Sequence, residues 1–210
     1  MKLMLAGASG LVGQQVLRQA LADPAVGGVV APTRTALPPA EKLENPVVDF
    51  ERLPADAPWW QVDAVICTLG TTMVQAGSQA AFRRVDHDFV LAVARLARAA
   101  GARAFVLNSA LGADAGSRVF YNRVKGEVEN ALATLGYASL TLVRPSLLDG
   151  GPRPVNRFAE RAGLVVARLL RPLIPARYRA VATTAVARTL LAAARAQLPG
   201  VHIIESERIA

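Results

Sequence analysis

The stretch LMLAGASGLVG, residues 3–13, decides the fold of this chain. A short apolar run ends directly at Gly7, and an amphipathic pattern begins at Leu11, so a strand turns into a helix across a glycine-rich loop. In such a loop the first glycine permits the tight turn, and the last allows the helix to pack closely on the sheet. The stretch therefore predicts the first strand, loop and helix of a βαβ unit.

The same loop predicts a binding site for a dinucleotide. Gly10 would let the backbone approach a pyrophosphate, and the N-terminal end of the helix would direct its N–H groups and positive dipole end at the phosphates. The spacing is G-x-x-G-x-x-G rather than G-x-G-x-x-G, and glycine turns also join strands to helices where no ligand binds. The residues expected to contact the dinucleotide here are Gly7, Ser9, Gly10, Leu11, Val12 and Gly13.

Short β-branched runs alternate with longer helical patterns along the rest of the chain, which indicates a parallel sheet. We expect strands near 2–6, 27–31, 46–49, 63–67, 104–108, 139–143 and 201–204, and helices over 11–22, 78–100, 117–135, 155–170 and 183–196. The predicted fold class is α/β, a doubly wound, mostly parallel Rossmann sheet flanked by helices. We expect residues 1–210 to form one NAD(P)-binding domain, with residues 149–180 as a substrate-covering segment by analogy with the fold.

The helix expected over 78–100 has the clearest pattern. Apolar side chains recur at spacings of three and four, most Arg and Asp side chains lie elsewhere, Ser78 is placed to cap the helix, and Gly101 is placed to end it. The apolar positions that would form its buried stripe are Phe82, Val85, Phe89, Val93 and Leu96.

The bulk composition indicates a soluble domain. Mean hydropathy is +0.30, but Gly, Pro or a charge interrupts every apolar run before the roughly 20 residues of a membrane span. The first apolar run is also too short for a signal peptide, and one cysteine cannot form an internal disulfide, so we expect a cytoplasmic protein.

The formal net charge of +8 makes nucleic acid a partner to consider, because basic surfaces attract polyanions. The charge is mostly Arg spread along Ala-rich helices, without basic blocks or interleaved aromatic residues, so nucleic-acid binding is not favoured. No membrane partner and no metal site are expected. The oligomeric state stays open, with a homodimer as one option.

Cofactor preference is read at the end of the second strand, where an acidic residue would suit NAD and a cation the 2′-phosphate of NADP. The stretch VVAPTRT, residues 29–35, has no Asp or Glu and contains Arg34, so NADP(H) is preferred over NAD(H). The alternative is that Arg34 is a solvated loop residue.

Further cofactor contacts are expected at the ends of the third and fourth strands. Asp49, followed by Phe50, could reach the adenine edge or equally cap the next helix. The small-residue turn at Thr68, Leu69 and Gly70 could pass beneath the cofactor. Cys67 before it is interpreted as a core residue, because nothing in the sequence marks a nearby base.

Tyr121 and Lys125 lie four residues apart, and hence on one face of a helix. A nearby ammonium favours the phenolate form, which suits acid–base chemistry. Ser109 ends the fifth strand and brings a hydroxyl to the carboxyl edge of the sheet, where ligands of open α/β sheets bind. Alone, the Tyr-x-x-x-Lys spacing is weak evidence, but the three residues together predict a catalytic group.

The chain resembles the short-chain dehydrogenase/reductase superfamily, specifically its atypical members in the group of the Tat-interacting-protein oxidoreductases. Besides the glycine loop, the resemblance includes CTLGTT at 67–72, FRRVD at 82–86, GAD at 112–114, YNRVKGE at 121–127 and Arg144-Pro145.

The resemblance implies hydride transfer between NADPH and a small carbonyl or alcohol. Tyr121 would donate or accept the proton, Lys125 would hold the nicotinamide ribose, and Ser109 would hydrogen-bond the substrate oxygen. Pro145 and the turn at 68–70 would line the nicotinamide half. Many relatives have Asn where this chain has Asp86, so Asp86 is left outside the predicted catalytic group.

Two functions follow from these expectations. The first is an NADP(H)-dependent oxidoreductase, which the joint presence of the three catalytic residues favours. The second is a regulatory or protein-interaction protein that binds NADPH with little turnover. The substrate is not predicted, because the segment 149–180 carries no recognisable motif.

Overall fold

A parallel seven-stranded sheet forms the centre of the protein, whose computed structural model describes residues 1–149 and 175–209. Its spatial order is β3 (Leu43–Glu44), β2 (Gly28–Val30), β1 (Lys2–Ala6), β4 (Ala64–Cys67), β5 (Ala104–Asn108), β6 (Ser139–Arg144) and β9 (Gly200–Glu205). The strand order reverses between β1 and β4, which opens a crevice at their carboxyl ends. The predicted doubly wound fold is confirmed.

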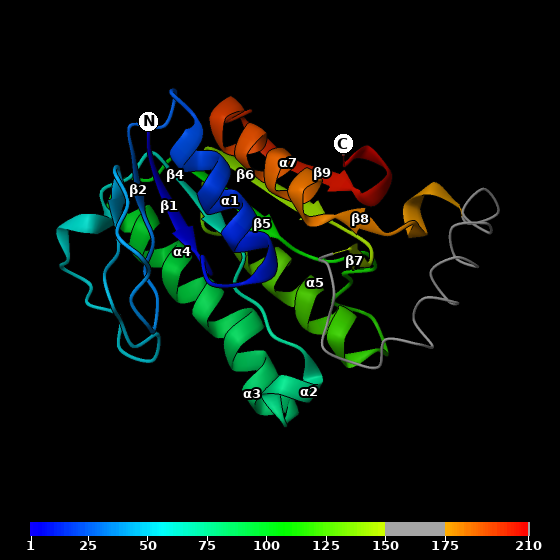
Figure 1. Cartoon of the computed structure of the whole chain (residues 1–210). Helices are drawn as coiled ribbons and strands as arrows, with labels where there is room; N and C mark the ends of the chain where they lie inside the picture. The colour runs from blue at the N-terminus through cyan, green and yellow to red at the C-terminus, as the bar shows by residue number, and fades with distance from the viewer. Residues whose placement is uncertain (150–174, 210) are drawn as a thin grey trace, which may run out of the picture.

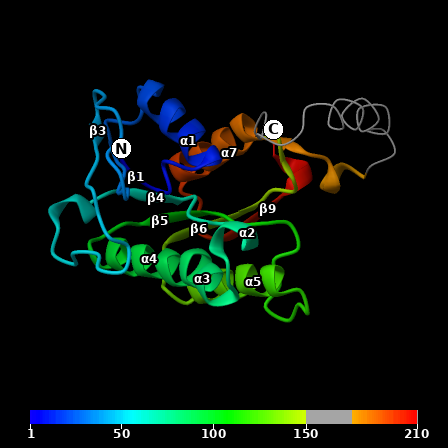
Figure 2. The same cartoon turned by 60° about the horizontal axis from the view of Figure 1, so that its bottom comes forward.

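Within residues 1–149 and 175–209, four long helices cover the two faces of this sheet. Figure 2 shows α1 (Leu11–Ala22) and α7 (Thr183–Ala196) on one side, and α4 (Phe89–Ala99) and α5 (Phe120–Ala133) on the other. None of the helices in the described ranges is long and apolar enough to cross a membrane. The same part of the chain also contains shorter helical elements, namely η1 (Pro58–Trp60), α2 (Met73–Ala76), α3 (Gln79–Arg83), η2 (Arg84–Asp88), η4 (Ala176–Tyr178) and η5 (Ser206–Arg208).

Alternate side chains of the central strands supply the two halves of the core. In β5, Phe105 and Leu107 pack on the side of α4 and α5, whereas Val106 packs on the side of α1 and α7. Both faces are buried, which explains why the central strands read as continuous apolar runs.

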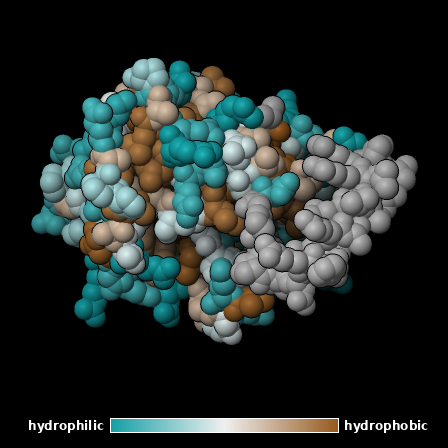
Figure 3. Space-filling view, in the orientation of Figure 1, coloured by the Kyte–Doolittle hydropathy of each residue, from teal (hydrophilic) through white to brown (hydrophobic). Residues whose placement is uncertain are grey.

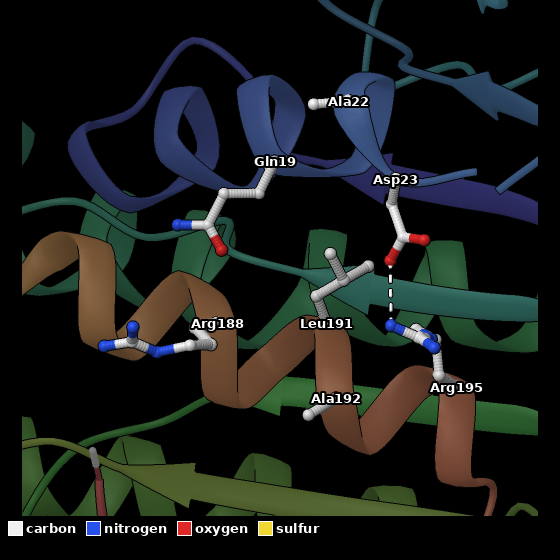
Figure 4. A pocket seen from close by; sticks show the side chains of 7 residues that line it. All are labelled: Gln19, Ala22, Asp23, Arg188, Leu191, Ala192 and Arg195. Carbon is white, nitrogen blue, oxygen red and sulfur yellow. Dashed lines mark hydrogen bonds and ion pairs between the residues drawn. The ribbon is translucent and has the colours of Figure 1, made fainter. Parts of the chain in front are cut away.

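Helices α1 and α7 lie side by side and leave a shallow groove between their outer surfaces (Figure 4). Asp23, just after the last turn of α1, pairs with Arg195 of α7 at 3.0 Å across this groove. Because α1 begins at the carboxyl edge of the sheet, its last turn and this groove lie toward the opposite edge. The groove is therefore separate from the glycine loop.

The third strand differs from the prediction of 46–49. Regular pairing with β2 occurs at Leu43–Glu44, and only a single bridge follows, between Thr33 and Val47. Pro46 has no N–H to donate, and the Asn45 side chain donates instead to the Ala31 carbonyl, so the ladder is interrupted between the two sites.

The helix expected over 78–100 is continuous but contains a π turn at its centre. Ser78 accepts a hydrogen bond from the Ala81 N–H at 3.1 Å, which confirms the cap. The extra residue of η2 rotates the buried face, so the fully buried positions after Phe82 include Asp86 and Val90 rather than Val85 and Phe89. The predicted stripe is therefore wrong in its middle.

Two further predictions meet the structure only in part. Helix α5 begins at Phe120 rather than at Ser117, because the Ser117 hydroxyl accepts the Val119 N–H in a separate turn. The short strands β7 (Leu148–Asp149) and β8 (Val181–Ala182) pair in parallel and bring the two ends of the predicted covering segment together. The helix expected over 155–170 lies outside the described residues (grey in Figure 1), and the covering segment stays a prediction.

Gly13→Ala will lower the free energy of unfolding by about 2 kcal/mol, because the added Cβ would lie 2.0 Å from the Gly7 carbonyl oxygen and the helix would have to move. Urea unfolding measures the change. Gly10→Ala is the matched control, since its Cβ would lie 3.4 Å from the same oxygen. Equal stability of the two variants would contradict the tight crossing of α1 over β1.

Candidate functional site

The glycine loop is packed directly against the turn that follows β4. Gly7 has φ +92°, and a Cβ there would lie 2.7 Å from the Leu69 N atom. The Thr68 hydroxyl hydrogen-bonds the carbonyls of Ala6 and Gly7, at 3.2 and 3.1 Å. The loop and the turn therefore form one rigid floor at the point where the strand order reverses.

The amino end of α1 fits a phosphate group. Ser9, Gly10 and Leu11 are exposed, no side chain caps the first turn, and no acidic residue lies in it. Val12 is buried against the sheet and fixes the direction of the helix. The N–H groups of this turn thus face solvent with the positive end of the helix dipole, which suits an anionic ligand.

Arg34 lies in an exposed bend just beyond β2, on the same edge of the sheet as the glycine loop. The bend is held by its neighbour Thr33, whose hydroxyl donates to the Thr35 carbonyl at 2.8 Å and accepts from Asn45 at 2.8 Å. Arg34 is therefore carried on an ordered turn. Whether it contacts a 2′-phosphate stays a prediction.

The two residues predicted after the third strand point in different directions. The Asp49 carboxylate accepts the Glu51 N–H at 2.9 Å and so stabilises a local turn. This contact resembles a helix cap, but no helix begins there. Phe50 is buried against Phe89 of α4, with ring centroids 5.8 Å apart. The contact of both residues with the adenine stays a prediction. For Phe50 this contact would involve the backbone, because the ring is buried.

One face of α5 carries three polar residues at successive helical turns, which are Tyr121, Lys125 and Glu129. The Tyr121 ring packs on Phe82 of α3, with centroids 5.5 Å apart, and no described residue hydrogen-bonds its hydroxyl. Lys125 and Glu129 are both 4% exposed. The face therefore carries a phenol near the surface and two charged groups beneath it.

Lys125 forms a buried ion pair with Asp86 of the π turn, with 2.8 Å between Nζ and Oδ1. Burial opposes the charge on Lys125, but the Asp86 carboxylate and the neighbouring Tyr121 outweigh it and raise the pKa of the ammonium. The second Asp86 oxygen accepts the Thr71 N–H at 2.8 Å. Asp86, which was left outside the predicted group, is thus in direct contact with it.

Ser109 is also in contact with α5, because its hydroxyl donates to Glu129 at 2.5 Å. The Ser109 O–H is therefore not directed at Tyr121 or Lys125. Glu129 is also bound by Arg144, whose Nε and Nη2 reach its two oxygens at 3.1 and 2.5 Å. These hydrogen bonds raise the pKa of Arg144, which also pairs with Glu205 at 3.0 Å. The structure therefore assembles a network that the sequence analysis missed, although Glu129 stands one turn beyond Lys125.

The remaining predicted positions line the same edge. The Pro145 carbonyl accepts the Leu111 N–H at 2.9 Å and so ties the end of β6 to the loop after β5. Gly70, the last residue of the β4 turn, lies against the ion pair, because a Cβ there would be 3.3 Å from Asp86 Oδ1. Cys67 is fully buried, and burial raises its pKa to about 12, so its assignment to the core is confirmed.

Exposed apolar side chains border this edge. Figure 3 shows hydrophobic residues at the lower tip of the molecule, over α2, where Val74 is 92% exposed. Val119, just before α5, is 58% exposed and Leu11 is 51% exposed. Apolar surface thus lies near both the glycine loop and the amino end of α5.

The chain matches a family model described as NAD(P)H-binding over residues 7–197. It is 41% identical over 147 residues to the rat (Rattus norvegicus) protein HTATIP2, with 68% of this chain and 60% of HTATIP2 in the alignment. It is 34% identical over 164 residues to Protein fmp52, mitochondrial, of Emericella nidulans, covering 74% of this chain and 70% of that protein. The chain thus spans less than two thirds of HTATIP2.

Solved structures support the fold. The UDP-glucuronic acid 4-epimerase of Bacillus cereus in complex with NAD superposes with a TM-score of 0.70 at 14% identity, over 98% of this chain and 78% of that chain. At this identity the likeness shows the fold alone.

The relatives correct one prediction. The fungal proteins from Emericella nidulans, Eremothecium gossypii and Candida albicans are all named mitochondrial. These names contradict the cytoplasmic location expected from the short apolar start and the single cysteine, because neither feature reports on compartment directly.

Glu129→Gln will lower the free energy of unfolding by about 3 kcal/mol, because it removes the buried counter-charge of Arg144 and leaves this guanidinium paired only with the less buried Glu205. Glu51→Gln is the control, since Glu51 pairs with Arg84 on the surface and its loss changes stability by less than about 1 kcal/mol. Denaturant titration of both variants tests this, and two equally small changes would show that the network contributes little.

Proposed function

Because this chain belongs to the NAD(P)H-binding family, as its resemblance to the atypical dehydrogenase/reductases predicted, we propose that it is an NADPH-dependent oxidoreductase acting on a small carbonyl compound or alcohol. One observation carries the proposal. The uncapped, exposed amino end of α1 and the buried pair of Lys125 with Asp86 lie on the same carboxyl edge of the sheet, with Tyr121 one helical turn before Lys125.

The residues at this edge fit a dinucleotide. The first turn of α1 would bind the pyrophosphate, and the turn at Thr68 to Gly70, pinned to Gly7, would lie beneath the nicotinamide half. Lys125 would donate to the nicotinamide ribose. When bound, NADPH supplies the hydride.

Tyr121 would supply the proton. Its hydroxyl is not hydrogen-bonded by any described residue, and it lies one helical turn from the Lys125 ammonium. On reduction of a carbonyl, the phenol gives its proton to the substrate oxygen and recovers one from solvent; on oxidation of an alcohol, the phenolate accepts that proton.

Ser109 would contact the substrate as a hydrogen-bond acceptor. Its O–H is donated to Glu129, whose two oxygens also accept from Arg144, so the lone pairs of the Ser109 oxygen are what remain for the substrate. Ser109 would therefore accept a hydrogen bond from the substrate hydroxyl. The exposed apolar side chains near α2 and α5 would border an apolar part of the substrate.

A second function is supported by the same geometry. The Ser109 hydroxyl and the Lys125 ammonium both have partners within the protein, which suits a protein that binds NADPH stably without turning it over. Such a protein would regulate a partner through cofactor occupancy. Turnover with any carbonyl compound separates the two functions.

Tyr121→Phe will abolish NADPH oxidation, followed at 340 nm with a panel of aldehydes and ketones, while NADPH affinity stays within about twofold of the wild type, because only the phenolic proton is removed. Tyr178→Phe is the control, since Tyr178 is exposed on η4. Full activity of Tyr121→Phe would refute this mechanism, and absence of turnover in the wild type would favour the regulatory function.

Arg34→Ala will weaken NADPH binding roughly tenfold and leave NADH binding unchanged, because a charge-assisted contact to the 2′-phosphate contributes about 1.5–3 kcal/mol. Titration of the cofactor fluorescence measures both constants. Arg52→Ala, at another exposed arginine, is the control. Equal losses for NADPH and NADH would show that Arg34 does not select the cofactor.

A further inference from the structure

The π turn η2 carries a carboxylate on the buried face of its helix, and the other buried side chains on that face are apolar. Asp86 is 1% exposed and lies within the π turn, four residues after the buried Phe82 and four before the buried Val90. π turns inside α-helices are rare and occur frequently at functional sites. Here the turn delivers Asp86 to the space between the β4 turn and α5.

The two oxygens of Asp86 hold two different parts of the site. Oδ1 is 2.8 Å from the Lys125 ammonium, and Oδ2 accepts the Thr71 N–H at 2.8 Å. Gly70, next to Thr71, leaves space for the Asp86 carboxylate, because a Cβ on residue 70 would lie only 3.3 Å from Oδ1. The carboxylate therefore joins the turn proposed to lie under the nicotinamide to the helix that carries Tyr121.

We propose that Asp86 is a positioning residue of the cofactor site, which holds the buried Lys125 protonated and fixed against the Thr68–Thr72 turn so that its ammonium can bind the nicotinamide ribose. This inference rests on the proposed function. Asp86 touches neither cofactor nor substrate in this account and acts through Lys125.

A purely structural function for the pair is the competing explanation. Taking two charges out of water is costly, and apolar side chains of similar volume often serve stability equally well, so a buried pair is weak evidence for stability. The pair also faces two other titratable groups, Cys67 of β4 and Tyr121 of α5. Because burial raises the pKa of Cys67 to about 12, its thiol stays neutral at physiological pH, and Asp86 is the main source of negative charge near Lys125.

Removing the carboxylate has a consequence that depends on pH. With Asp86 present, the pKa of Lys125 is raised, so Lys125 stays charged from about pH 6 to about pH 9. We therefore expect the contribution of Lys125 to NADPH affinity to be constant over this range. Without Asp86, burial acts unopposed and lowers the pKa of Lys125. The charged form is then lost as the pH rises, and affinity falls with it.

The test compares NADPH dissociation constants of Asp86→Asn and wild type by fluorescence titration between about pH 6 and about pH 9. We expect roughly tenfold weaker binding in the variant, increasing toward high pH, against a flat wild-type profile. Asp88→Asn is the control, because Asp88 is exposed on the same π turn and pairs with His87. Wild-type affinity for Asp86→Asn at every pH would overturn the proposal.

A second comparison separates positioning from folding. The comparison pairs Lys125→Met with the double variant Asp86→Asn/Lys125→Met. The double variant leaves neither charge in the core, so it is measurable even where a single variant, which strands the charge of its partner, fails to fold. If Asp86 acts through Lys125, the two variants bind NADPH equally. A further loss in the double variant would overturn the proposal. No binding of NADPH or NADH by the wild type would instead refute the proposed function itself.

Discussion

The close crossing of α1 over the end of β1 is the constraint on which the rest of the structure depends. Gly13 contacts the Gly7 carbonyl with no room for a side chain, and Gly7 in turn contacts the β4 turn. This contact fixes where α1 begins, and therefore where its uncapped N–H groups face solvent. It also fixes the β4 turn, to which Asp86 and Lys125 are tied through Thr71. One steric requirement thus positions both halves of the candidate site.

Charge at the site is organised in two buried sets on one face of α5. Lys125 is paired with Asp86 from the π turn, and Glu129 is paired with Arg144 from β6. Tyr121, one turn earlier, remains near the surface with its hydroxyl available to a ligand. This arrangement suits the proposed proton transfer, because Tyr121 is the one of these groups that is near the surface and without a partner among the described residues.

Much of the fold could be predicted because its signals are local. The run 3–13, the alternating strands and helices, and the cap at Ser78 depend on residues close in sequence, and all agree with the structure. The failures are also physical. Pro46 interrupts the third strand, and the π turn shifts the buried face of the helix by one residue, which a regular 3.6-residue period does not anticipate.

The sequence by itself determined the α/β class, the glycine loop and the presence of Ser109, Tyr121 and Lys125 on one edge, because strand ends and helical spacing are set by neighbouring residues. Only the tertiary structure decided how these groups are paired. Asp86 is 39 residues from Lys125, and Ser109 is 20 residues from Glu129 and on a different element. Ion pairs and hydrogen bonds of this kind form across elements, so they depend on packing geometry that no local pattern carries.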